Sequence, residues 1–367
     1  MQYRDFGTTG LKVSALGFGS MRLPMAGEHV DEDQAIAAIQ RAFELGVNYI
    51  DSAYFYNRYE SEVVVGKALK GWRDKVIVST KNPDTDVTQA RWREILEHQL
   101  KKLDVDFIDV YHFHGIRWAE FEEYIIKPGG VMETARQAQS EGLFKYLSFS
   151  FHDTPEALVK LVDTGEFTSV TLQYNLLDRA NEPGIARARE RGMGVMVMGS
   201  VGGGLLGPPP AEILGQLPGA SHNSVEVALR FVLSNPGVSC ALSGMSTREM
   251  VEENCAIASR TDPPTEAEME VILAQAEEKK RLAELYCTGC KYCLPCPHGV
   301  DIPANFSAMN NLRVYGMRQL ADYRYAELVS TGAAASFCQE CGECLEKCPQ
   351  KLAIIEQLKE THRALGR

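Results

Sequence analysis

The chain has 367 residues, of which 45% are hydrophobic and 24% charged, which is enough to bury more than one small core. Its formal net charge of −11 argues against a nucleic-acid partner, because phosphate binding needs a basic surface. No apolar run approaches the roughly 18 residues of a membrane span, and the polar opening MQYRDFGTTG does not resemble a signal peptide. We therefore expect a cytoplasmic protein with no membrane span.

Short apolar or β-branched runs recur along the first 260 residues, and each is followed by a helical pattern. Such runs are typical of parallel strands that are buried on both faces. The eight runs are SALGFG (14–19), NYIDSA (48–53), VIVSTK (76–81), DFIDVYHFHG (106–115), KYLSFSFH (145–152), SVTLQYN (169–175), GVMVMGS (194–200) and SCALSGM (239–245).

Eight alternating βα units in this length predict a (β/α)8 barrel. A doubly wound sheet is the alternative, but it usually carries GxGxxG after its first strand, and GFGSMRLP lacks that motif. Several of the predicted helix starts can cap the free amides of the first turn. The helices are expected to begin near Asp31, Glu60, Thr88, Gly130, Thr154, Asn181, Ser221 and Ser246.

Four polar residues are expected at the C-terminal ends of the strands, where barrels carry out their chemistry. Asp51, Lys81 and His114 end predicted strands two, three and four, and Tyr56 follows in the loop SAYFYNRYE. Singly, each has a structural alternative, such as a helix cap, a solvated lysine or a packed histidine. Together they suggest catalysis, because a buried ammonium needs an anion and lowers the pKa of a neighbouring phenol. Such a tyrosine can protonate a carbonyl oxygen as the carbon receives hydride, while a neutral histidine donates to that oxygen.

At these residues the sequence resembles the aldo-keto reductase family, and the likeness covers the whole barrel. RDFGTTGLKVSALGFGSMRLP is similar to the N-terminal hairpin and first strand of the family, GVNYIDSAYFYNRYESEVVVGKAL to its Asp and Tyr motif, and VIVSTK to its Lys motif. The resemblance implies an oxidoreductase with the tetrad Asp51, Tyr56, Lys81 and His114. His112 competes for the histidine role, since alternation places both imidazoles on the inward face, but the family motif ends on its histidine and favours His114.

The resemblance also implies a nicotinamide cofactor that is bound without a Rossmann fingerprint. GSVGGGLLG matches the loop over the pyrophosphate, and GMSTREMVEEN resembles the adenine-side segment. The chain departs from the family at Phe151, Met198 and Met250, which leaves the choice between NADP and NAD open and keeps a flavin as an alternative. The implied cofactor-binding residues are Gly19, Ser20, Met21, Ser150, Gln173, Met198, Gly203, Leu205, Gly244, Arg248, Glu253 and Asn254.

Aromatic residues near the expected mouth are candidates to line the substrate pocket. They are Tyr54, Phe55, Trp118 and Phe151, and plain packing at the barrel rim is the alternative for each. No motif identifies the small-molecule substrate that such a pocket would take.

Eight of the ten cysteines lie in two short runs near the C-terminus, CTGCKYCLPCP (287–297) and CQECGECLEKCP (338–349). The second run has the CxxCxxCxxxCP spacing of bacterial ferredoxins, and the first is one residue tighter. Zinc is the alternative, but it has no use for a third thiol at the next CxxC step. Two 4Fe-4S clusters are therefore predicted, and the fourth cysteine of each run is expected to ligate the other cluster. The two ligand sets are Cys287, Cys290, Cys293 and Cys348, and Cys338, Cys341, Cys344 and Cys296.

Residues between the two runs have the apolar spacing of two helices, which predicts an α-helical ferredoxin-like module. The expected organisation is a barrel over 1–260, a linker helix over 261–284 and the module over 285–367. One branch of the aldo-keto reductase family resembles the chain end to end, including both cysteine runs.

The predicted function is reduction of a carbonyl-type or quinone-like substrate with NAD(P)H, with electrons relayed by the clusters, or with both. A ferredoxin-like protein is the candidate electron-transfer partner. The alternatives are a non-catalytic redox-sensing or docking module and a flavin-dependent electron-transfer enzyme.

Overall fold

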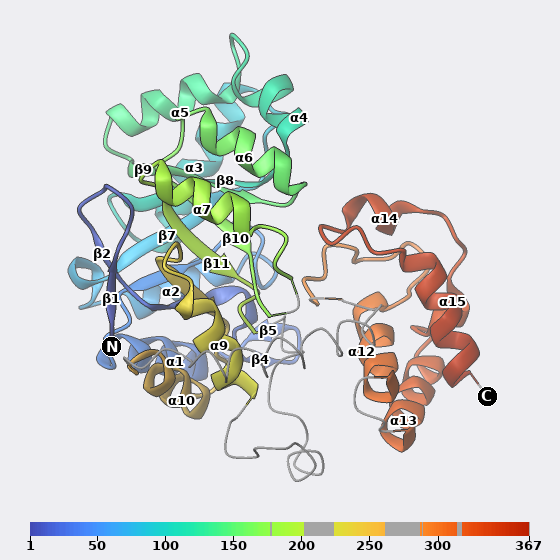
Figure 1. The fold of residues 1–367 in the computed structure, drawn as a ribbon. Coiled ribbons are helices and arrows are strands. Elements are labelled where there is room, and N and C mark those ends of the chain that lie inside the picture. The colour runs from blue at the N-terminus through green and yellow to red at the C-terminus, as the bar shows by residue number, and fades with distance from the viewer. Residues whose placement is uncertain (177, 202–223, 261–286, 288, 314–317, 367) are drawn as a thin grey trace. The chain divides into compact units, whose positions relative to one another are not determined.

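The structure is a computed structural model that describes residues 1–176, 178–201, 224–260, 287, 289–313 and 318–366 (Figure 1). The described residues form two compact units, a barrel unit over 1–200 and 228–260 and a C-terminal unit from residue 287 onward. The predicted linker helix over 261–284 lies outside the described residues, as do Gly203 and Leu205.

Eight parallel strands close into a barrel, in the order β10, β11, β12, β3, β6, β7, β8 and β9, which confirms the predicted fold class. Every predicted run overlaps one of these strands, and β7, β8 and β9 each extend one residue beyond their run. The runs are largely apolar, as strands that are covered on both faces are. The strands are β3 (Leu16–Gly19), β6 (Tyr49–Asp51), β7 (Ile77–Asn82), β8 (Ile108–Ile116), β9 (Phe144–Phe151), β10 (Ser169–Gln173), β11 (Gly194–Met198) and β12 (Cys240–Ser243).

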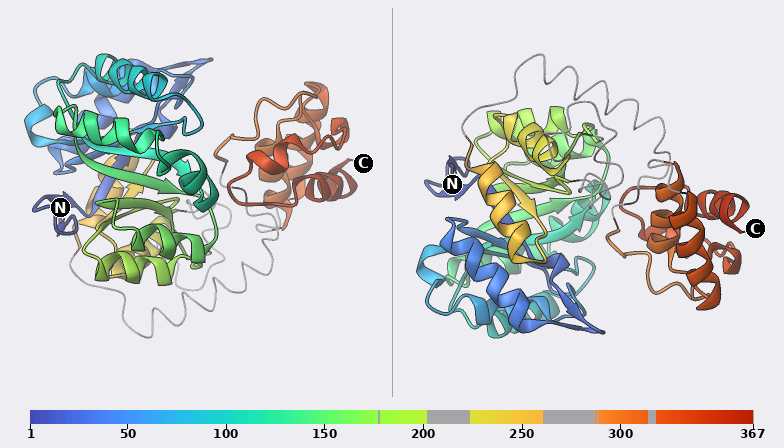
Figure 2. Two further views of the ribbon diagram at one scale, coloured as in Figure 1. Left: turned by 90° about the horizontal axis from the view of Figure 1, so that it is seen from above. Right: turned by 90° about the horizontal axis from the view of Figure 1, so that it is seen from below.

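Helices surround these strands in both views of the barrel unit (Figure 2). Four of them begin after a residue whose side chain accepts a hydrogen bond from a first-turn amide, namely Asp31, Thr88, Thr154 and Thr247. The barrel helices are α1 (Glu32–Glu44), α2 (Ser61–Ala68), α3 (Gln89–Leu103), α5 (Val131–Ser140), α6 (Pro155–Asp163), α7 (Glu182–Glu190), α9 (Ser224–Ser234) and α10 (Arg248–Ala258).

Shorter elements complete the barrel unit. The hairpin of β1 (Tyr3–Asp5) and β2 (Lys12–Ser14) precedes the barrel, and β4 (Met25–Ala26) pairs with β5 (His29–Val30) after the first barrel strand. The others are the 3-10 helices η1 (Ser20–Arg22) and η2 (Arg73–Lys75), α4 (Trp118–Glu120) and a π-helical turn, η3 (Phe121–Ile125).

The barrel interior changes from apolar to polar along the strands. An apolar cluster at the strand starts contains Tyr49, Ile77 and Val110, and it is joined by Phe6 and Val13 from the N-terminal hairpin segment. The inward-facing positions that follow this cluster towards the C-terminal ends of the strands are buried and polar. An apolar floor thus lies under a polar mouth at the C-terminal ends of the strands. The polar positions are Ser79, His112, Ser148, Ser169 and Thr171.

All the regular secondary structure described in the C-terminal unit is helical, and it includes the two helices that were predicted between the cysteine runs. Its core packs Phe306, Met309, Tyr325 and Leu358 around each other. Among the described residues, no helix is long and apolar enough to cross a membrane. The elements are α12 (Ile302–Arg313), α13 (Arg318–Ser330), the 3-10 helix η5 (Ala335–Phe337), α14 (Glu343–Lys347) and α15 (Ile354–Leu365).

Candidate active site

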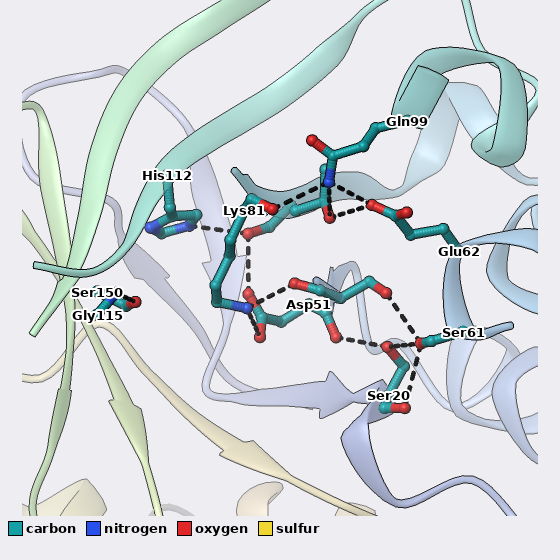
Figure 3. Close-up of polar contacts among 12 residues, drawn as sticks. Ser20, Asp51, Ser61, Glu62, Lys81, Gln99, His112, Gly115 and Ser150 are labelled. Atoms are coloured by element: carbon teal, nitrogen blue, oxygen red, sulfur yellow. Dashed lines mark hydrogen bonds and ion pairs between the residues drawn. The ribbon is translucent and has the colours of Figure 1, made fainter. Parts of the chain in front are cut away.

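Asp51 and Lys81 form a buried ion pair at the ends of neighbouring strands β6 and β7. Lys81 Nζ donates to Asp51 Oδ2 at 2.6 Å and to the carbonyl oxygen of Ser52 at 2.6 Å (Figure 3). Burial lowers the pKa of Lys81, and the Asp51 carboxylate acts against that shift. The ammonium therefore has an anion and a carbonyl within hydrogen-bond distance, as a buried charge requires.

Tyr56 lies over this ion pair. Its ring centroid is 5.0 Å from Lys81 Nζ, and the residue is only 9% exposed. The chain turns sharply after Tyr56, because Asn57, Arg58 and Tyr59 all have left-handed backbone angles, with φ of 49°, 55° and 71°. Asn57 Nδ2 donates to the carbonyl oxygen of Ser20 at 2.7 Å and so ties this turn to the segment after β3. The turn leads directly into α2 and keeps Tyr56 at the barrel mouth.

His114 contacts Tyr56 edge-on, with 6.0 Å between the ring centroids and an interplanar angle of 81°. Phe55 also stacks on the His114 ring, with 4.8 Å between the centroids. Strand β8 has an extra residue against β9 between Phe113 and Ile116, and Gly115 has φ of +66°. Bulges of this kind redirect a side chain next to an active site. Burial first, and then the Lys81 charge, hold the pKa of His114 well below its ordinary value, so the imidazole is neutral.

His112 occupies a deeper layer of the barrel than His114. Its Nε2 lies 2.9 Å from Ser79 Oγ, and its backbone is in register with that of Lys81 (Figure 3). The two histidines thus have different neighbours, Tyr56 for His114 and Ser79 for His112. Alternation alone could not distinguish them, because it puts both on the inward face, and only the family motif favoured His114.

The predicted cofactor residues of the barrel lie at or beyond the C-terminal ends of its strands. Gln173 and Met198 end β10 and β11 and are in register with each other, and Ser150 is the last-but-one residue of β9. Ser150 Oγ accepts a hydrogen bond from the Gly115 amide at 2.7 Å (Figure 3). A barrel brings these strand ends together around one mouth.

The remaining cofactor candidates follow β3 and β12. Gly19 ends β3, and Ser20 and Met21 belong to η1, where the Ser20 hydroxyl donates to the carbonyl oxygen of Asp51 at 2.8 Å. Gly244 packs closely on Arg22, since a Cβ added at this glycine would lie 3.1 Å from the Arg22 Cβ. Helix α10 carries the three last candidates. Asn254 Nδ2 donates to Ser243 Oγ at 3.1 Å, Arg248 pairs with Glu252 at 3.1 Å, and Glu253 is exposed.

A buried polar network lies on the helix side of β7 and was not predicted from the sequence. The carboxylate of Glu62 is fully buried and accepts hydrogen bonds from Thr80 Oγ1 at 2.6 Å, Gln99 Nε2 at 2.5 Å and Lys102 Nζ at 2.8 Å. Gln99 also donates to the carbonyl oxygen of Lys81 at 3.0 Å (Figure 3). This network fixes the backbone that carries Lys81. The signal that could have revealed it is STKN, four consecutive polar residues in a strand that must be buried.

Phe151 does not line the mouth, so its prediction as a pocket residue is wrong. It is 2% exposed and lies 6.4 Å from Phe149, its neighbour on the same face of β9. Phe149 packs at 4.7 Å on Phe167, in the layer between strands and helices. Because side chains alternate along a strand, Ser148 and Ser150 face the barrel interior and both phenylalanines face away.

The eight cysteines of the C-terminal unit surround two cavities of about 320 and 370 Å³. Both volumes include space that is open to solvent. In the part of the chain that the structure describes, no group of three or more His, Cys, Asp or Glu side chains is arranged so that it could hold a single metal ion. The smaller cavity is lined by Cys287, Cys290, Cys293 and Cys348, and the larger by Cys296, Cys338, Cys341 and Cys344, with Cys293 at its edge.

Electrostatics give the same two groups of thiols. Burial, and then the neighbouring Cys290 and Cys287, raise the pKa of Cys293 to about 12, with a smaller contribution from Cys348. The pKa of Cys344 is raised by burial and then by Cys338, Cys296 and Cys341. The last cysteine of each run therefore lies with the first three of the other run, which is the arrangement that two-cluster ferredoxins require.

Comparisons with known proteins place the barrel and the C-terminal unit in two families. Residues 15–209 match the model of the aldo/keto reductase family, and residues 286–353 match that of a 4Fe-4S dicluster domain. The uncharacterized oxidoreductase YqkF of Bacillus subtilis (strain 168) is 27% identical over 287 residues, which cover 69% of this chain and 90% of that protein. L-galactose dehydrogenase of Arabidopsis thaliana is 29% identical over 306 residues, which cover 74% and 94%.

A solved structure from the same family is also similar to this chain. The holo form of the aldo-keto reductase AKR11C1 from Bacillus halodurans is 29% identical and superimposes with a TM-score of 0.64, over 75% of this chain and 96% of that one. The first family model spans more than half of the chain, and the closed barrel with its strand-end polar residues is described above. The chain therefore belongs to the aldo/keto reductase family, as an oxidoreductase that also carries a C-terminal 4Fe-4S domain.

Proposed function

We propose that the barrel reduces a carbonyl-type or quinone-like small molecule with a hydride from NADPH or NADH, and that Tyr56 donates the proton. The supporting observation is the Lys81 ammonium, which lies 2.6 Å from the Asp51 carboxylate and 5.0 Å from the centroid of the Tyr56 ring. A cation in this position stabilises the phenolate that proton transfer leaves behind. His114, which is neutral and in edge contact with Tyr56, supplies a hydrogen bond to the same substrate oxygen.

The strand ends fit a nicotinamide cofactor. Ser150 and Gln173 present a hydroxyl and an amide at one mouth, and Gly199 is needed beside Gln173, because an added Cβ would lie 3.0 Å from Gln173 Oε1. When bound, the cofactor supplies the hydride to the substrate carbon. The residues proposed to hold it are Gly19, Ser20, Met21, Ser150, Gln173, Met198, Gly203, Leu205, Gly244, Arg248, Glu253 and Asn254.

The two cysteine-lined cavities fit two 4Fe-4S clusters. The proposed ligands are the four thiols that surround each cavity, in the exchanged arrangement described above. A bound cluster carries one electron at a time. Cys341 is exposed, whereas Cys293 and Cys348 are buried, so the cluster of Cys341 is the better placed to exchange electrons with a ferredoxin-like partner.

A flavin-dependent reaction is the second candidate, and the presence of a phenylalanine at position 151 favours it. The family resemblance implies an asparagine after the serine of this strand, whereas the phenylalanine here has no amide to offer a nicotinamide carboxamide. A flavin accepts two electrons and passes them on singly, which would connect hydride chemistry to the clusters. The non-catalytic alternative is disfavoured, because a sensor has no need of a buried ammonium beneath Tyr56.

The test compares Tyr56→Phe with Tyr54→Phe in full-length protein purified without oxygen. Tyr54 was a candidate pocket residue, but its ring packs instead against Tyr59, His98 and the Lys102 ammonium, on the side of α3, so it serves as a matched control. With a panel of aldehydes, ketones and quinones, Tyr56→Phe should lose about 100-fold or more of the NAD(P)H-dependent activity and still bind nicotinamide, while Tyr54→Phe should behave like the parent. Activity of Tyr56→Phe within tenfold of the parent would show that another group supplies the proton.

A further inference from the structure

Below the Asp51–Lys81 pair, buried side chains from three adjacent strands form a continuous row of hydrogen bonds. His112 Nε2 lies 2.9 Å from Ser79 Oγ, and Ser79 Oγ lies 2.9 Å from Asp51 Oδ1 (Figure 3). The other carboxylate oxygen, Asp51 Oδ2, receives Lys81 at 2.6 Å. All four residues are at most 4% exposed, so water does not compete for these bonds.

The number of available protons fixes the direction of the row. An ionised carboxylate only accepts, so the single hydroxyl proton of Ser79 points to Asp51. Ser79 Oγ can then interact favourably with His112 only by accepting a proton from Nε2. Burial, and then the Lys81 charge, keep the pKa of His112 well below its ordinary value, and the Phe149 backbone opposes this shift only in part, so the ring is neutral. The neutral ring must therefore be the tautomer that carries its proton on Nε2.

We propose that His112 is a positioning residue, which acts through Ser79 to hold the Asp51 carboxylate that in turn holds Lys81 beneath Tyr56. The inference rests on the proposed function, since the position of Lys81 matters to catalysis only if Tyr56 transfers a proton. The strand register supports it, because His112 is aligned with Lys81 and Asp51 with Ser79, which makes the row a property of three adjacent strands. Replacement of His112 by an apolar residue leaves Ser79 without this donor and the carboxylate less constrained.

Not every polar side chain in this layer belongs to the row. Ser148 of β9 is in register with His112, but its hydroxyl donates to the carbonyl oxygen of Ser169 at 2.8 Å and accepts from Ser169 Oγ at 2.8 Å. Ser148 therefore provides a control at the same depth in the barrel, with the same burial and with partners outside the site.

A spectroscopic test works whether or not the protein reduces carbonyls, so it separates this inference from the proposed function. The full-length, cluster-loaded protein is labelled with 15N-histidine, and the His112 signals are assigned as those missing from His112→Gln. At pH 7 we expect the shifts of a neutral ring protonated on Nε2. A ring protonated on Nδ1, or an imidazolium, would overturn the inference.

A kinetic test then measures the consequence for the site. His112→Leu should lower kcat roughly tenfold with the KM for nicotinamide unchanged, the size expected for one lost hydrogen bond near the reacting groups. His112→Gln, whose amide can donate to Ser79, should recover most of this loss, and Ser148→Ala should match the parent. Ser79→Ala should equal His112→Leu, and the double variant should be no worse than either. Equal losses in the Leu and Gln variants, or additive losses in the double variant, would contradict a positioning role.

Discussion

The Lys81 ammonium and the Asp51 carboxylate meet at 2.6 Å, with side chains that are only 2% and 6% exposed. Removal of one partner from a buried pair leaves an uncompensated charge, which typically costs about 3–5 kcal/mol. The pair therefore affects both the stability of the barrel and the chemistry proposed for Tyr56.

Lys81→Met should abolish carbonyl reduction and lower the free energy of unfolding by about 3 kcal/mol or more, because Asp51 is left buried and unpaired. Addition of Asp51→Asn should restore part of the stability and none of the activity. Lys102→Met is the matched control, since Lys102 pairs with the buried Glu62 at 2.8 Å on the other side of β7. It should lose stability while keeping much more activity than Lys81→Met. Equal activity losses in the two lysine variants, measured with urea denaturation and steady-state rates, would assign the effect to folding alone.

Cysteine substitutions should affect the clusters in exchanged pairs. Cys287→Ser and Cys348→Ser should perturb the same EPR signal of the reduced protein, because both residues line the smaller cavity. Cys338→Ser and Cys296→Ser should perturb the other signal. If Cys296→Ser instead matched Cys287→Ser, each run would hold its own cluster and the exchanged ligand sets would be wrong.

Much of the barrel could be predicted because its buried parallel strands are largely apolar runs of similar length that alternate with helical patterns. The histidines show where such reasoning ends: alternation predicts that His112 and His114 face inward, but their partners depend on the register of β7 and β8 and on the bulge at Gly115. Phe151 was mispredicted because the position of a residue near a strand end does not say which face it occupies.

The hydrogen-bond partners of the buried polar side chains were the other feature that the sequence could not predict. Glu62 and Gln99 are 37 residues apart and belong to different helices, so only the closed barrel brings them together behind Lys81. The cysteine sets were predictable to a greater extent, because the ferredoxin spacing carries a rule for which thiols meet.

His152 should make the barrel sensitive to acid. Its ring packs against Gly115, and burial, followed by the charges of Arg117 and Lys81, lowers its pKa to about 4. Between pH 6.5 and about 4 the unfolded chain binds a proton that the folded chain does not, so this residue stabilises the fold fully above pH 6.5 and progressively less as the pH falls. In His152→Asn the fall in unfolding free energy over this range should be smaller by about 3 kcal/mol. Identical pH slopes for the variant and the parent would rule out this role.

The turn after Tyr56 should store backbone strain. Arg58 has φ of 55°, and a left-handed backbone costs roughly 1 kcal/mol for a residue with a Cβ. Arg58→Gly should raise the unfolding free energy by about 0.5–1 kcal/mol, because glycine adopts this conformation freely. Arg58→Ala serves as the control, since it also loses the exposed ion pair with Glu28 but keeps the strain. The explanation fails if the alanine variant is stabilised as much as the glycine variant.

The most direct test of the proposed chemistry follows a deuterium label. The full-length protein, prepared without oxygen, reduces an aldehyde or ketone in ordinary water with NADPH that carries deuterium at both C4 positions. We predict one deuterium on the carbinol carbon of each product molecule, and loss of product formation in Tyr56→Phe but not in Tyr54→Phe. Product without deuterium would contradict direct hydride transfer at Tyr56, because a reduced flavin or the clusters would have exchanged the label with water.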